Sequence, residues 1–371
     1  MVPERLQENR LMERTDLHTD VSLRWLRYVL NPDTEAPDVC DWASVLDFAY
    51  KQSLIGICLP EVCPESMPKT LLLGWIGQVQ MIEQRNCLIN KRIEQLFEMM
   101  ERDGFECCLL KGQGNAEKYP NPLRRTPGDI DIWVDADQET VYRYVHCKFP
   151  DEEVSFKHIH FPIFSDVPVD VHVTPLKLFS RRSQKRLQCW IERNKEEQFA
   201  HHVTLHGCER TVSVPTDAFN AVYQMGHMLM HFFDEGLGLR QVVDYFYVLQ
   251  RLDSAQYRSI AETFRELGML RFGRALMWVE TDVLGLPPSC CIVEPDERLG
   301  KQILDDIIEG GNFGHHTQRF KGKRGFYHRG VANARRIMRL FKVAPGECMA
   351  RLLRKFGTVF RHVAGKKRRM Y

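Results

Sequence analysis

Apolar positions recur at helical spacing through the first part of this chain, which has 371 residues in all. Trp42, Val45 and Ala49 form an apolar stripe, before prolines at positions 60, 64 and 68 interrupt the pattern. Leu71–Met100 is amphipathic throughout and is followed by Asp103-Gly104, which predicts one long helix with a clear end. The N-terminal part of the chain is therefore expected to be helical.

Beyond residue 105 the pattern changes to short apolar runs of the kind that form strands. The predicted strands are Cys107–Leu110, Asp129–Val134, His158–Phe164 and Val167–Val173. Short helices are expected before Tyr119 and over Gln138–Cys147. This order of elements predicts an α+β fold, in which helices flank a small mixed sheet.

Helical spacing returns after Pro175 and continues towards the C-terminus. Helices are predicted over Thr216–Phe233, Arg240–Leu252 and Ala261–Leu284, with two amphipathic helices around Val331–Phe341 and Met349–Phe360. We therefore expect four units: an N-terminal helical region at 1–80, an α/β core at 81–180, a helical domain at 181–318 and a basic helical tail at 319–371.

Charge is distributed unevenly, although the net charge is only +2. Residues 319–371 hold 17 Lys and Arg but a single acid, Glu347, so the rest of the chain is acidic. Such a tail suits an anionic partner: a nucleic acid, a membrane surface, or the acidic body of the same chain, against which a pair of helices would dock.

Composition and hydropathy indicate a soluble protein of the cytoplasm, with association at a membrane surface as the alternative. The charged N-terminal segment lacks the apolar stretch of a secretory signal, and no apolar run is long enough for a transmembrane segment. The twelve cysteines are scattered without a CxxC pair, which favours reduced thiols over a zinc ribbon.

Two acids, Asp129 and Asp131, alternate with apolar residues at the start of a predicted strand. The period of a strand places both carboxylates on one face and Ile130 and Ile132 on the other. Such close carboxylates repel each other unless a cation lies between them, and Mg²⁺ prefers oxygen ligands of this type. Asp170, alone in another apolar strand, would complete a site for two metal ions. The alternative is a turn cap and a solvent-exposed acid.

The residues around these acids resemble a known family. Residues 108–134 contain Leu-Lys-Gly, then Tyr-Pro-Asn-Pro-Leu-Arg-Arg and Gly-Asp-Ile-Asp, which together resemble the signature of the uncharacterised nucleotidyltransferase family of the polymerase-beta-like superfamily. Val169–His172 and residues 236–244 are also similar, and the resemblance extends over roughly residues 40–290.

The resemblance implies a nucleotidyltransferase fold with Asp129, Asp131 and Asp170 as catalytic metal ligands. Two Mg²⁺ ions are expected, with Mn²⁺ as an alternative. The implied reaction transfers a nucleotidyl group from a nucleoside triphosphate, such as ATP, to an acceptor hydroxyl on an unknown small molecule, sugar, peptide or protein. The alternative function is a catalytically weak protein of the same fold that binds nucleic acid or a membrane surface through its tail.

Five further residues are candidates for binding the nucleotide. Lys111, Gly112 and Gly114 stand where most of the superfamily has Gly-Ser or Gly-Gly, so the phosphate loop is atypical. The glycines allow a close approach of phosphate to the backbone, and Lys111 either adds charge there or extends to solvent. Of Arg124 and Arg125, which precede the acids in a proline-bounded loop, Arg124 is the preferred phosphate ligand, and an ion pair or a surface position is the alternative.

Histidines and one charged pair are a last set of candidates. His158, His160 and His172 allow a zinc triad, but hydrogen-bonded core histidines are the favoured interpretation. His227 and His231 have ligand spacing, yet the residues between them suggest core packing. Arg240 and Asp244 are placed to pair with each other on a helix, and either Arg240 or His231 is expected to face the cleft.

Overall fold

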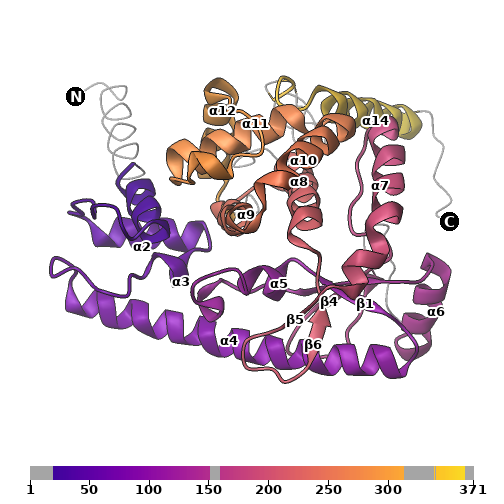
Figure 1. Ribbon diagram of the computed structural model, residues 1–371, viewed down its shortest axis with the longest axis horizontal. Coiled ribbons are helices and arrows are strands. Elements are labelled where there is room, and N and C mark those ends of the chain that lie inside the picture. Colours follow the sequence, from indigo (N-terminus) through magenta and orange to yellow (C-terminus); the bar gives the residue numbers. More distant parts are fainter. Residues whose placement is uncertain (1–19, 151–158, 313–337, 339, 364–371) are drawn as a thin grey trace.

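The computed structural model describes residues 20–150, 159–312, 338 and 340–363. An α/β layer lies along one side of the molecule and a body of helices along the other (Figure 1). The N-terminal helices are residues 20–30, α2 (Trp42–Lys51), α3 (Ile55–Cys58) and α4 (Lys69–Arg102). The long helix predicted over Leu71–Met100 is thus confirmed as α4.

The α/β layer contains a four-stranded mixed sheet. Its strands are β1 (Cys107–Leu110), β2 (Ile130–Val134), β3 (Ile159–His160) and β4 (Val169–His172), in the spatial order β1-β2-β4-β3. Strands β2 and β4 are parallel, whereas β1 and β3 pair antiparallel with β2 and β4 respectively. The predicted α+β class with a small mixed sheet is therefore confirmed, although the third strand is much shorter than predicted.

The two faces of the sheet belong to two different hydrophobic cores. Ile130 and Ile132 pack in one core with Ile93 of α4 and with α6 (Gln138–Lys148). Trp133, which has the opposite phase in β2, joins the core of the helical body. Because side chains alternate along a strand, Asp131 shares the phase of Trp133 and faces the helical body.

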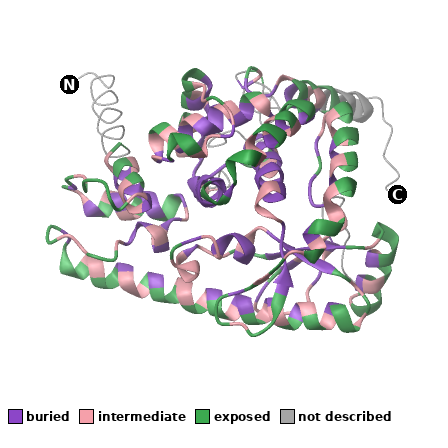
Figure 2. Cartoon of the chain, in the orientation of Figure 1, coloured by how far each residue is buried: buried purple, intermediate pink, exposed green. Residues whose placement is uncertain are grey.

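The helical body follows the sheet in the sequence. Its helices are α7 (Arg181–Ala200), α8 (Asp217–Asp234), α9 (Leu239–Arg251), α10 (Ser254–Leu267), α11 (Leu270–Trp278), the π-helix η2 (Val279–Val283) and α12 (Glu297–Gly310), with short 3₁₀ turns η1 (Pro122–Arg124) and η3 (Pro288–Cys290) elsewhere. Helices α8 and α9 are the most buried, whereas the outer face of α4 is exposed (Figure 2).

Two features of this body differ from the sequence prediction. A hairpin of β5 (His202–Thr204) and β6 (Thr211–Ser213) interrupts a stretch for which only helices were predicted, and β6 packs against β1. The helical pattern predicted over Ala261–Leu284 is confirmed as α10, α11 and η2, but it is interrupted at Gly268, whose left-handed conformation (φ +77°) ends α10.

The described part of the basic tail packs against the helical body. Helix α14 (Pro345–Val363) places Glu347 under the start of α7, where its carboxylate accepts hydrogen bonds from the backbone N–H groups of Phe179 and Ser180. Arg351 forms an ion pair with Asp234 of α8. The predicted helix around Val331–Phe341 lies almost wholly outside the described residues. Among the helices that are described, none has the length and apolar character needed to cross a membrane.

Candidate active site

Three aspartates meet where strands β2 and β4 run side by side. The parallel register places Asp131 directly opposite Asp170, and Asp129 immediately precedes β2. One carboxylate oxygen from each of the three residues lies within 4.8 Å of the others. Two of the acids are thus neighbours in the sequence, and strand pairing brings Asp170 beside them from a distant segment of the chain.

The three carboxylates have different electrostatic surroundings. Repulsion from Asp131, together with burial, raises the pKa of Asp129. Burial would also raise the pKa of Asp131, but Lys111 and His172 outweigh this effect and lower that pKa well below its usual range. Asp131 is therefore the anion that the surrounding protein stabilises, whereas Asp129 is the one that would gain most from an added cation.

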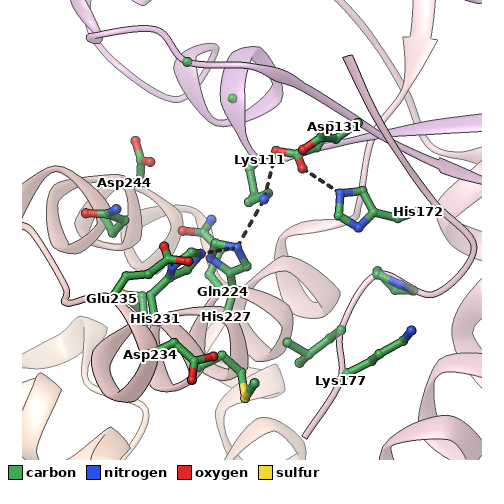
Figure 3. A pocket seen from close by; sticks show the side chains of 18 of the residues that line it. Lys111, Asp131, His172, Lys177, Gln224, His227, His231, Asp234, Glu235 and Asp244 are labelled. Carbon is green, nitrogen blue, oxygen red and sulfur yellow. Dashed lines mark hydrogen bonds and ion pairs between the residues drawn. The ribbon is translucent and has the colours of Figure 1, made fainter. Parts of the chain in front are cut away.

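Lys111, at the end of β1, points at these acids. Its ammonium lies 2.8 Å from Oδ2 of Asp131 and donates to Nε2 of His227 at 3.1 Å. The other oxygen of Asp131 accepts from Nε2 of His172 at 2.6 Å (Figure 3). Lys111 also has a positive φ of +52°, which is uncommon for a residue with a side chain. The structure thus favours a buried partner of the acids over a lysine that extends to solvent.

A line of side chains continues from Lys111 into helix α8. Because an ammonium can only donate, His227 accepts at Nε2 and must be deprotonated there. Nε2 of His231 lies 3.0 Å from the same atom, and Nδ1 of His231 donates to Glu235 at 3.0 Å. Burial, followed by the charge of Lys111, lowers the pKa of His227 well below its ordinary value.

Arg125 connects the α/β layer to helix α9. Its guanidinium donates two hydrogen bonds to the carboxylate of Asp244, at 2.7 and 2.8 Å, and the hydroxyl of Tyr119 donates to the same carboxylate at 2.6 Å. Both partners of this ion pair are almost fully buried. The pairing of Arg240 with Asp244 that we expected along the helix is replaced by this bond between layers.

Arg240 lies beside this pair and faces the acids. Its Nη1 donates to the carbonyl of Thr126 at 3.0 Å, in the loop before Gly128 and Asp129. Burial and the charge of Arg125 lower the pKa of Arg240 to about 10, so it still carries its charge at neutral pH. Arg240 therefore adds a second guanidinium at this end of the site.

All these groups surround one cleft of about 800 Å³ between the two layers. Its lining includes Lys111, Gly112, Arg125, Gly128, Asp129, Asp131, Asp170 and His172 from the α/β layer, and Gln224, His227, His231, Arg240, Gln241 and Asp244 from α8 and α9. A cleft of this size is in the usual range for a small-molecule site. Both Arg240 and His231 face it, where we expected one of them.

Two of the predicted nucleotide ligands lie outside the cleft lining. Gly114 is buried beneath it, close to Val214. Arg124 pairs with Glu83 and donates to the carbonyl of Leu59 on the far side of its loop. Our preference for Arg124 over Arg125 is therefore corrected: consecutive residues in this loop point in opposite directions, and the one that reaches the cleft is Arg125.

The loop that carries both arginines rests on helix α3 at Gly56. A Cβ atom at this position would overlap the carbonyl oxygen of Arg124. On its other side the loop is held by the buried Asn86 of α4, whose side-chain amide donates to the carbonyls of Leu123 and Arg125. The position of Arg125 thus depends on a close backbone contact as well as on Asp244.

The two strand histidines that are described, His160 and His172, accompany the acids. His172 donates to Asp131, and Nδ1 of His160 lies 3.4 Å from Asp170. His158 lies outside the described residues. The favoured interpretation, hydrogen-bonded histidines, fits the two that are described.

His227 is a cleft residue for which the sequence analysis favoured core packing over a place in the site. Helix α8 is buried on almost all sides, so the apolar neighbours of His227 suggested core packing. The available signal was its spacing of four residues from His231, which places two imidazoles on one helical face. That spacing alone does not reveal which face meets the acids.

A cluster of three carboxylates that could hold a metal ion lies in the wall of a cleft on an α+β scaffold. The model of the family described as "Uncharacterised nucleotidyltransferase" matches residues 38–285, which is more than half of the chain, and the chain belongs to this family. The resemblance expected from the Leu-Lys-Gly and Gly-Asp-Ile-Asp motifs is thereby confirmed.

Two other comparisons give no further information about the site. No curated protein matches the chain. Among solved structures, an antigenic nucleotidyltransferase-like protein from Paracoccidioides brasiliensis is similar, with 12% sequence identity and a TM-score of 0.27, over 50% of this chain and 88% of that one. A similarity this weak carries no argument about the site.

Proposed function

We propose that this protein is a Mg²⁺-dependent nucleotidyltransferase that transfers a nucleotidyl group from a nucleoside triphosphate to an acceptor hydroxyl. The observation that carries the proposal is the convergence of Asp129, Asp131 and Asp170 within 4.8 Å, in the wall of a cleft, in a member of this family. ATP is the first donor to test, and a location in the cytoplasm is part of the proposal.

The three carboxylates fit a hard divalent cation. Each offers an oxygen atom, and the raised pKa of Asp129 reflects negative charge that its neighbours leave uncompensated. When bound, Mg²⁺ would neutralise charge on the triphosphate and activate the acceptor hydroxyl. Mn²⁺ would fit the same oxygen ligands, and the sequence predicts two ions here.

We assign different roles in this reaction to the residues that line the cleft. Arg125 and Arg240 place two guanidinium groups near Asp129, and we propose that Arg240 in particular contacts phosphate oxygens. Gly112, whose φ is +38°, keeps the backbone beside Asp129 free of a side chain. Lys111 and His172 hold Asp131 in one orientation from both sides.

The experiment is incubation of the full chain with ATP, CTP, GTP or UTP, labelled at the α-phosphate, in the presence of Mg²⁺ and a cell extract. The expected result is a labelled acceptor that appears with one or more of these nucleotides and disappears when EDTA removes the metal. The identity of the labelled product would then show whether the acceptor is a small molecule, a sugar, a peptide or a protein.

The matched control is Asp170→Asn, which removes one carboxylate and leaves the pairs Lys111–Asp131 and His172–Asp131 in place. We expect this variant to fold, as judged by circular dichroism, and to label nothing. Labelling of equal intensity by wild type and Asp170→Asn would contradict the proposal, as would labelling that EDTA does not affect.

A further inference from the structure

The ammonium of Lys111 lies against the acids that we propose as metal ligands. Its ammonium is 2.8 Å from Oδ2 of Asp131, and its side chain is 20% exposed. Asp131 links the other two acids of the cluster, because it lies two residues after Asp129 and stands opposite Asp170 in the register. The ammonium therefore lies among the ligands of the proposed centre and not at its periphery.

The ammonium is held from two directions. The ammonium donates one hydrogen bond to Asp131 and another, of 3.1 Å, to Nε2 of His227 on helix α8. Because an ammonium can only donate, this nitrogen of His227 carries no proton and its lone pair accepts from Lys111. The positive φ of Lys111 places its side chain here at a conformational cost. These contacts describe a cation with a fixed position.

The formal charges of the cluster agree with a single further cation. Three carboxylates carry a charge of −3, and the ammonium reduces it to −2, which one divalent ion balances. Sites with two metal ions hold them about 3.5–4 Å apart across a shared carboxylate. Oδ1 of Asp131 already accepts from His172, and Oδ2 accepts from Lys111. Each oxygen keeps a second lone pair that one ion can use, whereas a second ion beside Oδ2 would meet the positive charge of the ammonium.

We infer that the ammonium of Lys111 takes the place of one of the two metal ions, so that the protein binds one divalent ion at Asp129, Asp131 and Asp170. The inference rests on the proposed function and refines its metal requirement. In this arrangement His227 is a positioning residue, since it acts on the site through Lys111. The Lys-Gly sequence after β1, atypical as a phosphate loop, then supplies a built-in cation.

The test counts Mn²⁺ ions bound to the full chain, by electron paramagnetic resonance of free Mn²⁺ during titration without nucleotide. We expect one tightly bound ion for wild type and two for Lys111→Met, which keeps the length of the side chain and removes its charge. Lys118→Met is the matched control, because Lys118 pairs with Asp217 and lies outside the cleft lining. It should bind one ion, like wild type.

Two ions on wild type would overturn the inference, even if Lys111→Met proved unable to fold. One ion on folded Lys111→Met, with unchanged affinity, would also overturn it and leave Lys111 as an ion-pair partner only. Asp170→Asn separates these outcomes from a failure of the proposed function. If this variant binds Mn²⁺ as wild type does, or if wild type binds none, the metal centre itself is wrong.

Discussion

The two walls of the cleft are built in different ways. On the sheet wall, Asp131 and Asp170 are placed by hydrogen bonds between strand backbones, so their separation follows from the register. On the helical wall, His227 and Arg240 project from α8 and α9, and hydrogen bonds of their side chains set their positions. The sheet wall therefore presents acids fixed by the backbone to side chains that packing and hydrogen bonds hold in place.

This difference decides what a substitution does in each wall. An acid of the sheet wall can be removed while the backbone register stays, so the expected loss is in binding or chemistry. A charged residue that joins the walls supports their packing, so its removal is expected to lower the free energy of unfolding. The variants below test this distinction, with one exposed pair and one buried acid outside the cleft for comparison, beginning with the largest expected effect.

Asp131→Asn should have the largest effect, because it removes a metal ligand and the anchor of Lys111 together. We expect nucleotidyl transfer to fall by more than about 100-fold, beyond the loss typical of a group that only orients a ligand. Steady-state rates with the nucleotide found in the labelling experiment would measure this. Activity within a few-fold of wild type would place the metal elsewhere.

Asp244→Asn should mainly affect stability, because it leaves Arg125 buried without its anionic partner. Breaking a buried ion pair in this way costs about 3–5 kcal/mol of the free energy of unfolding. Urea unfolding followed by circular dichroism would measure the change.

The control for this pair is Glu262→Gln, which breaks the exposed pair with Arg258 on α10. Exposed pairs of this kind contribute little, so the urea midpoint should stay close to that of wild type. Similar destabilisation by both variants would show that Arg125 and Asp244 are not a special link between the walls.

His172→Ala removes a donor that orients Asp131 but leaves the three carboxylates. We expect metal affinity to fall by about 10–100-fold, as for other residues that hold a metal ligand in place. Calorimetric titration with Mn²⁺ would test this. A loss as complete as that of Asp131→Asn would make His172 a ligand itself, and no loss would remove it from the site.

Glu280→Gln should have the smallest effect, and its size depends on pH. Glu280 lies fully buried in η2, and among the described residues neither of its carboxylate oxygens has a hydrogen-bond partner. Burial raises its pKa well above the ordinary 4.5. Above pH 4.5 the unfolded chain therefore loses a proton that the folded chain keeps, and stability falls as pH rises.

Glutamine does not titrate, so the melting temperature of Glu280→Gln should exceed that of wild type by an amount that grows from pH 4.5 towards pH 8. Differential scanning calorimetry across this range would measure it. A constant difference would indicate that the carboxyl group stays ionised when folded. The contrast with Asp131, whose pKa is lowered by its partners, shows what those partners contribute on the sheet wall.

Much of the sheet wall was predictable because its signals are local. The phase of Asp129 and Asp131 against Ile130 and Ile132 indicated which face the acids share, and β1 has the predicted bounds. That Asp170 joins Asp131 in one cluster was predictable, since each is an acid in an apolar strand. The register of the two strands was not, because it depends on hydrogen bonds between segments far apart in the sequence.

The helical wall was less predictable because its contacts join residues that are far apart in the sequence. Periodicity placed Arg240 and Asp244 on one helical face, yet Asp244 finds a better partner in Arg125 from another layer. The strands of the β5–β6 hairpin have three residues each, too few for an alternating pattern. The choice between Arg124 and Arg125 depends on the path of a loop, which composition does not encode.

The contact between Gly56 and the carbonyl of Arg124 has a consequence for how variants of this chain would be ranked. Any side chain at position 56 displaces the loop and, with it, the guanidinium that joins the two walls. In a mutational scan scored by growth or activity, position 56 would therefore group with residues of the cleft, although helix α3 lies outside it. Intolerance to substitution at position 56 would then reflect a close backbone contact. A scan interpreted only in terms of ligand binding would wrongly assign Gly56 to the binding site.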